Sequence, residues 1–253
     1  MDHKKLLAAA ILSGWAVSAA AAPVYIAPYG YDGPGSGLQD QLNAITEGGV
    51  SSIDVNSNQL SDGEDSYWNL TASGGSVSTF ILEIAGNADS NTFGVYDRND
   101  PTRYVELFSG AAKPDDGFGS QVTLTILADG SVGVNNIDTG IDFTSGDFGY
   151  YLGTASGPTF YSDSSLNEDD SDQMVAFQGN NSDVVTIPGF KSGVWTDNEF
   201  ILAWEDTLYG NSDMDFNDLV VMVESVLPVP EPGTLALLGL GLVGLGAARR
   251  RKA

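Results

Sequence analysis

The stretch Phe200-Ile-Leu-Ala-Trp-Glu205-Asp206-Thr-Leu-Tyr-Gly-Asn-Ser-Asp213-Met-Asp215-Phe-Asn217-Asp218-Leu-Val-Val-Met-Val223 places an acidic loop between two apolar runs. Each run has the length and the β-branched and aromatic content of a strand. If the two strands pair as a long-looped hairpin, Glu205 and Asp206 leave one strand where Asp218 enters the other. Carboxylates from both strands then meet beside the turn of the loop.

Six side chains of this loop carry oxygen atoms that can surround one cation: Glu205, Asp206, Asp213, Asp215, Asn217 and Asp218. Calcium accepts about six to eight oxygen ligands at flexible angles and needs no nitrogen or sulfur. We therefore expect calcium as the cofactor. Two alternatives are a solvated acidic turn, whose side chains accept hydrogen bonds from local backbone amides, and a catalytic carboxylate pair.

An EF-hand is a second way to interpret the same spacing. Three oxygen-bearing residues of the loop fall at the first, third and fifth positions of an EF-hand, and Glu224 falls at the twelfth. The sixth position is Asp218 instead of glycine, and a β-branched run follows. A strand from Leu219 carries Glu224 away at roughly 3.3 Å per residue, so we reject the EF-hand. A helix from Leu219 would restore it.

Short apolar or alternating runs also fill the chain upstream of the acidic loop. The expected strands are 77–84, 92–96, 104–108, 122–126, 132–137, 148–152, 174–177, 184–187, 199–204 and 219–226. No helical period intervenes, and Ala128-Asp129-Gly130-Ser131 is a strong hairpin signal. The sequence predicts an all-β fold, with an antiparallel β-sandwich or jelly-roll-like domain over residues 76–228.

Residues 22–75 have a different composition, rich in Gly, Ser, Asp and Asn. Leu38, Leu42 and Ile45 are spaced four and three residues apart, which predicts a short surface helix. We expect this region to form a small cap on the β domain.

Composition and charge exclude several classes of function. The chain has 253 residues, no cysteine and a single histidine, His3. This excludes disulfides, a cysteine nucleophile, a Ser-His-Asp triad and the Cys and His ligands of most transition-metal sites. Residues 22–232 keep four of the 10 Lys and Arg and all 34 acids except Asp2, for a net charge of −29. We therefore expect no nucleic-acid partner.

The amino-terminal end has the order of a secretory signal. Lys4 and Lys5 precede an apolar run over residues 6–17, and small residues follow up to Ala22. Residues 1–21 are therefore expected to form a signal helix. We expect signal peptidase to cut between Ala21 and Ala22. An uncleaved anchor helix is the alternative.

Three elements follow one another in residues 229–253. They are Pro230-Glu231-Pro232, an apolar run over 234–248, and the cations Arg249, Arg250, Arg251 and Lys252. The prolines prevent a helix from propagating upstream, the run approaches the roughly 20 residues of a bilayer span, and the cations anchor its cytoplasmic end. The sequence predicts a transmembrane helix, because four consecutive cations cannot pack in a core.

This end resembles the PEP-CTERM sorting signal of Gram-negative bacteria that make exopolysaccharide. The resemblance implies that Pro230, Glu231 and Pro232 are recognised by an exosortase, a membrane-embedded transpeptidase-like protease. It also implies that the exported protein stays in the inner membrane transiently, through its C-terminal helix. After processing, the protein is expected at the cell surface or in the extracellular matrix.

Residues 148–226 resemble a bacterial domain of unknown function, family 4114 (DUF4114), often found in exported, calcium-associated surface proteins. The resemblance is carried by Phe148-Gly149-Tyr150-Tyr151-Leu152, by Trp204-Glu205-Asp206 and by the run over 213–221. It marks these residues as the ones to test: Glu205, Asp206, Asp215, Asn217 and Asp218.

The combined expectation is a non-enzymatic surface or biofilm-matrix protein with a calcium-stabilised β domain. It would contact exopolysaccharide or other surface proteins. Tyr150, Tyr151, Trp195 and Trp204 are candidates to stack on sugars, although each also suits a core position.

Two other functions remain open on the sequence alone. The first is a two-carboxylate polysaccharide hydrolase, with carboxyl groups about 5 Å or about 6.5–9.5 Å apart. A deep cleft lined by aromatic residues around such a pair, without a metal, would favour it. The second is a purely structural sheath component, which differs by lacking ion-dependent stability.

Overall fold

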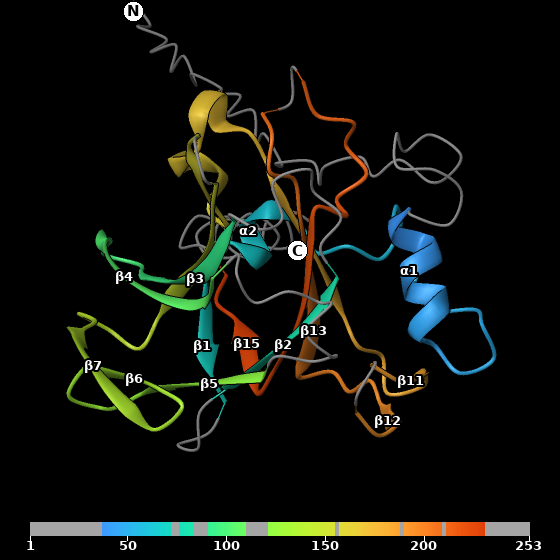
Figure 1. Ribbon diagram of the computed structural model, residues 1–253, viewed down its shortest axis with the longest axis horizontal. Coiled ribbons are helices and arrows are strands. Elements are labelled where there is room, and N and C mark those ends of the chain that lie inside the picture. The colour runs from blue at the N-terminus through green and yellow to red at the C-terminus, as the bar shows by residue number, and fades with distance from the viewer. Residues whose placement is uncertain are drawn as a thin grey trace, which may run out of the picture.

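The computed structural model describes residues 37–71, 76–82, 91–109, 121–154, 157–187, 190–208 and 211–230. Two sheets of antiparallel strands enclose the largest hydrophobic cluster, so the expected all-β antiparallel sandwich is confirmed (Figure 1). No helix in these ranges has the length and apolar character needed to cross a membrane. The predicted signal helix and transmembrane helix lie outside the described residues.

The first sheet has six strands in the order β15-β1-β8-β3-β4, with β9 also paired to β8. Its strands are β1 (Trp68–Leu70), β3 (Thr92–Asp97), β4 (Asp100–Ser109), β8 (Phe148–Gly153), β9 (Thr159–Tyr161) and β15 (Val226–Pro228). The strand β1 comes from the Gly- and Ser-rich region before residue 76. Its fully buried Trp68 therefore connects that region to the core of the sandwich.

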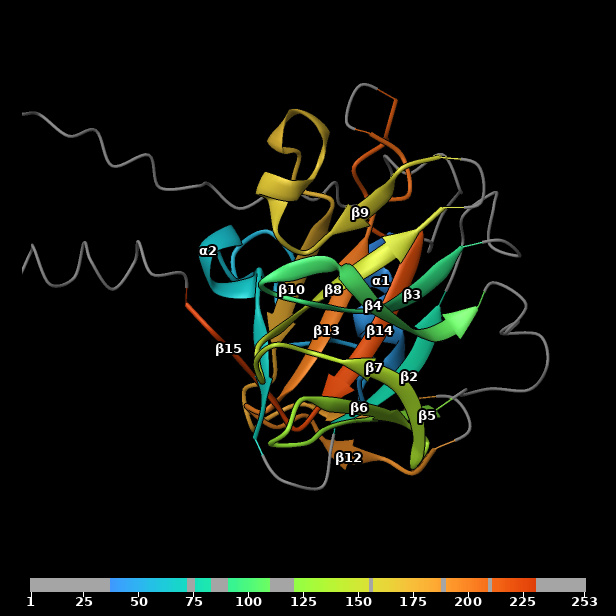
Figure 2. The ribbon, with the colours of Figure 1, turned by 90° about the vertical axis from the view of Figure 1, so that its left-hand side faces the viewer.

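The second sheet has seven strands in the order β10-β13-β14-β2-β5-β6-β7 (Figure 2). Its strands are β2 (Ser76–Leu82), β5 (Gln121–Ile126), β6 (Ser131–Val134), β7 (Ile137–Asp142), β10 (Met174–Gln178), β13 (Glu199–Trp204) and β14 (Leu219–Glu224). A separate ribbon pairs β11 (Val184–Val185) with β12 (Gly193–Val194).

The β13–β14 hairpin is buried on both of its faces. Phe200, Leu202 and Trp204 pack in the cluster between the two sheets, whereas Ile201 and Ala203 pack in a second cluster on the opposite face. Successive side chains of a strand point to opposite faces, so both must be apolar. This explains why the sequence here is a continuous apolar run.

The helix α1 (Leu38–Ile45) covers the second cluster, beside β13 and far from β3 and β4 (Figure 1). Leu38, Leu42 and Ile45 are buried, as the helical spacing predicts. The remaining helical segments are short: α2 (Asp62–Asp65) and the 3₁₀ turns η3 (Ser164–Leu166) and η4 (Glu168–Asp170).

Two turns divide runs that the sequence analysis treated as single strands. The run 132–137 was wrongly predicted to be one strand, because Asn135 and Asn136 adopt left-handed φ values of 52° and 63° and join β6 to β7. Asparagine tolerates this conformation, which tight hairpins require. Similarly, Ser225, with a φ of 61°, ends β14 and passes the chain to β15 in the other sheet.

The outer face of the six-stranded sheet carries tyrosines packed over glycines. Tyr96 on β3 lies opposite Gly149 on β8, and a Cβ atom added to Gly149 would overlap the Tyr96 ring. The ring is thus held against the backbone of the neighbouring strand. A side chain at position 149 would push it away.

We therefore expect Gly149→Ala to lower the free energy of unfolding by about 1–3 kcal/mol, the usual effect of overpacking. The matched control is Gly193→Ala, where an added Cβ meets nothing within 4 Å. Urea unfolding followed by tryptophan fluorescence measures both variants. Equal stability of the two would show that the Tyr96 ring is free to move.

Candidate metal centre

The loop 205–218 begins and ends at a firmly paired point of the sandwich. Trp204 and Leu219 form the last pair of the β13–β14 ladder. Just beyond it, the Asp206 backbone N–H donates to Oδ2 of Asp218 at 2.8 Å, and the Glu205 N–H donates to the carbonyl of Gln173 at 3.0 Å. The two ends of the loop are therefore fixed beside each other.

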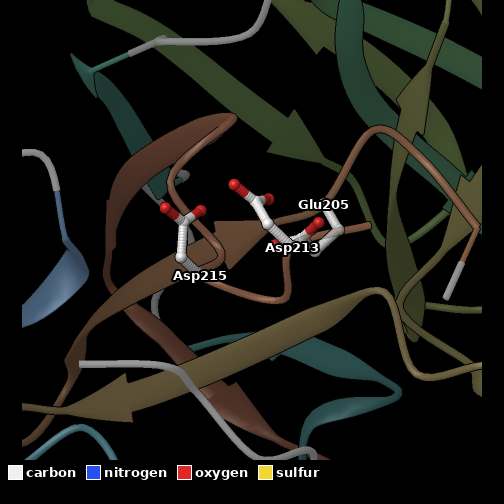
Figure 3. A group of neighbouring side chains, drawn as sticks. All are labelled: Glu205, Asp213 and Asp215. Carbon is white, nitrogen blue, oxygen red and sulfur yellow. The ribbon is translucent and has the colours of Figure 1, made fainter. Parts of the chain in front are cut away.

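Three carboxylates converge inside this loop. Glu205, Asp213 and Asp215 each have an oxygen within 4.8 Å of an oxygen of the other two (Figure 3). Only 1% of Glu205 and 1% of Asp215 is exposed, whereas Asp213 is half-buried. We call these three residues the carboxylate cluster.

Local hydrogen bonds hold Glu205 in place within the cluster. Its Oε1 accepts from the Phe216 backbone N–H at 2.6 Å, and its Oε2 accepts from the Ser212 hydroxyl. The neighbouring Asn217 is fully buried, and its Nδ2 donates to Oδ2 of Asp215 at 2.8 Å. The far side of the loop is thus tied to the end of β13.

The backbone of the loop takes an unusual conformation at two positions. Met214 and Phe216 have left-handed φ values of 60° and 51°. For residues other than glycine, such a conformation costs of the order of 1 kcal/mol and persists only where the surroundings enforce it. Here the buried Phe216 side chain packs in the cluster beneath α1 and anchors the turn.

Burial and mutual repulsion change the acidity of the carboxyl groups. Burial raises the pKa of Glu205 to about 7, although its hydrogen bonds with Ser212 and Phe216 oppose the change. Burial also raises the pKa of Asp218 to about 8, and the negative charges of Asp206, Glu205 and Asp215 add to the effect. Both groups therefore hold a proton more tightly than an exposed carboxyl.

The basic side chains that the structure describes between the two ends of the chain have their contacts outside the carboxylate cluster. Arg98 pairs with Asp147 at 3.0 Å, and Arg103 pairs with Asp100 at 3.2 Å. Lys191 lines a different pocket.

The remaining predicted ligands have other contacts. Asp206 and Asp218 hydrogen-bond to each other where the loop begins and ends, and they are not members of the carboxylate cluster. Oδ2 of Asp206 also accepts from Nδ2 of Asn91 at 3.1 Å. Pro230 is exposed at the end of the described chain. The other terminal residues with predicted roles lie outside the described residues: Ala21, Ala22, Glu231, Pro232, Arg249, Arg250, Arg251 and Lys252.

The structure also decides two of the alternatives left by the sequence. Leu219 begins the strand β14, which confirms the argument against an EF-hand. Three of the four aromatic residues considered for stacking on sugars occupy core positions instead. They are fully buried in hydrophobic clusters: Tyr150, Trp195 and Trp204. Tyr151 packs on the opposite face of its sheet, among other tyrosines.

Sequence reasoning missed two residues that support the loop. The fully buried Gln173 donates from Nε2 to the carbonyl of Thr207 at 2.8 Å, and Ser212 donates to Glu205. Gln173 lies 32 positions before Glu205. Only the pairing of β10 with β13 brings the two together, so no local pattern reveals it.

Taken together, the sandwich and its carboxylate loop define an acidic β domain whose last strand leads directly to Pro230. Residues 118–226 match the family described as "Domain of unknown function (DUF4114)", and residues 228–252 match the "PEP-CTERM protein-sorting motif". The chain therefore carries a DUF4114 domain followed by a PEP-CTERM motif, which implies export and processing at the membrane of a Gram-negative bacterium. No curated protein and no solved structure matches the chain.

The raised pKa values predict how stability depends on pH in the presence of a chelator. The folded state holds protons on Glu205 and Asp218 that the unfolded chain releases near its ordinary values of 4.5 and 3.8. The free energy of unfolding is therefore expected to fall as pH rises through these values towards about 8. The fall is about 1.4 kcal/mol for each unit between the pKa of a group in the folded state and its pKa in the unfolded chain.

Thermal melts between these pH values test the expectation. Glu205→Gln and Asp218→Asn should each reduce the fall, because neither amide titrates. The control is Asp129→Asn, which removes an exposed carboxylate whose pKa is lowered by the Ser131 hydroxyl. A pH profile unchanged by the first two substitutions would contradict the assignment.

Proposed function

We propose that this protein is a non-enzymatic component of the cell surface or of the exopolysaccharide matrix, sorted by an exosortase and stabilised by calcium. The observation that carries the calcium site is the convergence of Glu205, Asp213 and Asp215 within 4.8 Å in a loop fixed at both ends. Oxygen ligands without nitrogen or sulfur suit calcium, and its flexible coordination suits an irregular loop.

Mutual repulsion gives the physical reason for a bound cation. Two carboxylates about 4 Å apart repel each other by about 1 kcal/mol in water and by several times more at the lower effective dielectric of a protein. Protonation relieves this repulsion at low pH, and a divalent cation relieves it at neutral pH. Calcium and protons should therefore compete for the carboxylate cluster.

The burial of the cluster favours a structural role over hydrolysis. A glycosidase must place its two carboxyl groups on either side of a sugar, about 5 Å or more apart. Glu205 and Asp215 are 1% exposed, so a polysaccharide has little access to them. The same burial suits an ion that holds a loop together.

Calcium is expected to stabilise the chelator-treated protein at neutral pH. At a concentration about 100 times its Kd, a bound ligand contributes about 2.7 kcal/mol, which corresponds to several degrees in Tm. Asp215→Asn and Glu205→Gln should largely abolish this shift. Asp169→Asn is the matched control, since Asp169 lies in the separate acidic turn η4 and asparagine tolerates its left-handed φ of 58°.

Scanning calorimetry with calcium, with magnesium and with chelator measures the effect. Magnesium should stabilise the fold less, because it requires regular octahedral geometry and loses water reluctantly. A Tm that does not respond to millimolar calcium would remove the calcium part of the proposal. The sorting part would stand.

The sorting route is tested separately by replacing Pro230, Glu231 and Pro232 with alanine. Because exosortase recognition depends on this motif, the variant is expected to accumulate uncut in the membrane fraction of a host that has an exosortase. Pro228→Ala, two residues upstream in β15, is the control and should be processed normally. Fractionation and mass spectrometry of the C terminus distinguish the two results, and normal cutting of the triple variant would exclude the route.

A further inference from the structure

A groove of about 420 Å³ lies on the outer face of the six-stranded sheet, and none of its lining residues belongs to the loop 205–218. A volume of this size is within the range of small-molecule sites. Side chains of β3, β4, β8 and β9 line it, among them Tyr104, Tyr151, Tyr161, Glu106, Thr92 and Thr159.

The register of the strands explains why the sheet is hollowed here. One row across the sheet runs from Tyr161 to Tyr151, then to Gly94 and Glu106, and the next row places Gly153 between Thr159 and Thr92. A Cβ added to Gly94 would lie 2.5 Å from the Tyr151 ring. The missing glycine side chains therefore let Tyr151 lie against the sheet and leave space above it.

Three tyrosines line this groove, and one of them, Tyr151, is only 5% exposed. Tyr104 is 58% exposed, and its ring forms a T-shaped pair with the Tyr151 ring, with the centroids 5.7 Å apart. Tyr161 is half-buried and is held from behind by Tyr96, at 5.0 Å between centroids. Contacts between rings thus support Tyr151 and Tyr161, while Tyr104 extends into solvent.

Polar groups surround the rings. The hydroxyls of Thr92, Thr154 and Thr159 and the exposed carboxylate of Glu106 line the groove beside the tyrosine hydroxyls. Among the described lining residues there is one carboxylate and no Lys or Arg. An anionic ligand would be repelled by Glu106, and a hydrolase would need a second carboxyl group.

We infer that this groove binds a neutral saccharide. A pyranose ring presents C–H faces that pack on tyrosine rings and hydroxyls that exchange hydrogen bonds with Thr, Tyr and Glu side chains. The groove offers both kinds of contact side by side. This inference rests on the proposed surface role and supplies the ligand class that such a protein contacts, but it uses none of the calcium ligands.

The test measures binding of soluble hexasaccharides to the full chain in a non-glycosidic detergent. Isothermal titration calorimetry with maltohexaose, cellohexaose and mannohexaose provides the neutral probes. A hexamer of galacturonic acid is the anionic probe, and a proline decapeptide represents the other ligand type that aromatic grooves accept. At least one neutral hexasaccharide is expected to bind, and the other two probes are not.

Two variants locate the binding. Tyr104→Ala should weaken it about tenfold, the factor that corresponds to about 1.4 kcal/mol. Thr159→Trp should abolish it by filling the groove from the edge, while leaving every tyrosine in place. Leu127→Ala is the control, because this side chain is 53% exposed and does not line the groove. Thermal melting confirms that each variant is folded.

The inference is overturned if no neutral hexasaccharide binds, if Tyr104→Ala and Thr159→Trp bind as tightly as the parent, or if only the anionic or peptide probe binds. Titrations in calcium and in chelator separate this result from the proposed function. Saccharide binding without a calcium response would support the groove and contradict the calcium site. A calcium response without saccharide binding would support the calcium site and contradict the groove.

Discussion

The structure depends on the burial of both faces of β13 and β14. Their side chains supply the cluster between the sheets and the cluster under α1, so this hairpin connects all the layers of the domain. Each fully buried Leu- or Phe-sized side chain contributes about 1.5–3 kcal/mol. Because the hairpin is held so firmly, the two ends of the loop 205–218 cannot separate. Carboxylates that repel each other are therefore kept close together by packing that lies outside the loop.

The loop follows from the same constraint. Phe216, near the end of the loop, packs in the cluster under α1. Glu205, at the start of the loop, directly follows the buried Trp204, and its carboxylate accepts from the Phe216 N–H. Both residues are therefore buried, one from each end of the loop. The left-handed backbone at Met214 and Phe216 accommodates this burial. Core packing thus offsets both backbone strain and charge repulsion. Protons lower the energy of such a site, and the proposed calcium would compete with them.

The sequence predicted the features that depend on local patterns. The two apolar runs indicated that β13 and β14 pair and that the acidic loop closes on itself, and the helical spacing of Leu38, Leu42 and Ile45 indicated α1. The turn at Asn135 and Asn136 was missed although it is local, because the apolar run continues on both sides of the two asparagines. That Trp68 joins the sandwich was not predicted because it depends on which distant strands pair. Sequence reasoning treated six oxygen-bearing residues as one group, whereas Asp206 and Asp218 are used to close the hairpin.

The two outer faces of the sandwich differ, and the segment that leads to Pro230 and the groove lie on the same one. The helix α1 packs over β10, β13 and β14 of the seven-stranded sheet, while the six-stranded sheet carries a row of tyrosines. At one end of this row the Val229 N–H donates to the carbonyl of Tyr67 at 2.7 Å, one residue before Pro230. Tyr67 contacts Tyr96, and Tyr96 contacts Tyr161 at the edge of the groove. The chain therefore leaves the domain at one end of the face and the groove lies at the other. Cutting at the sorting motif would remove nothing that lines the groove.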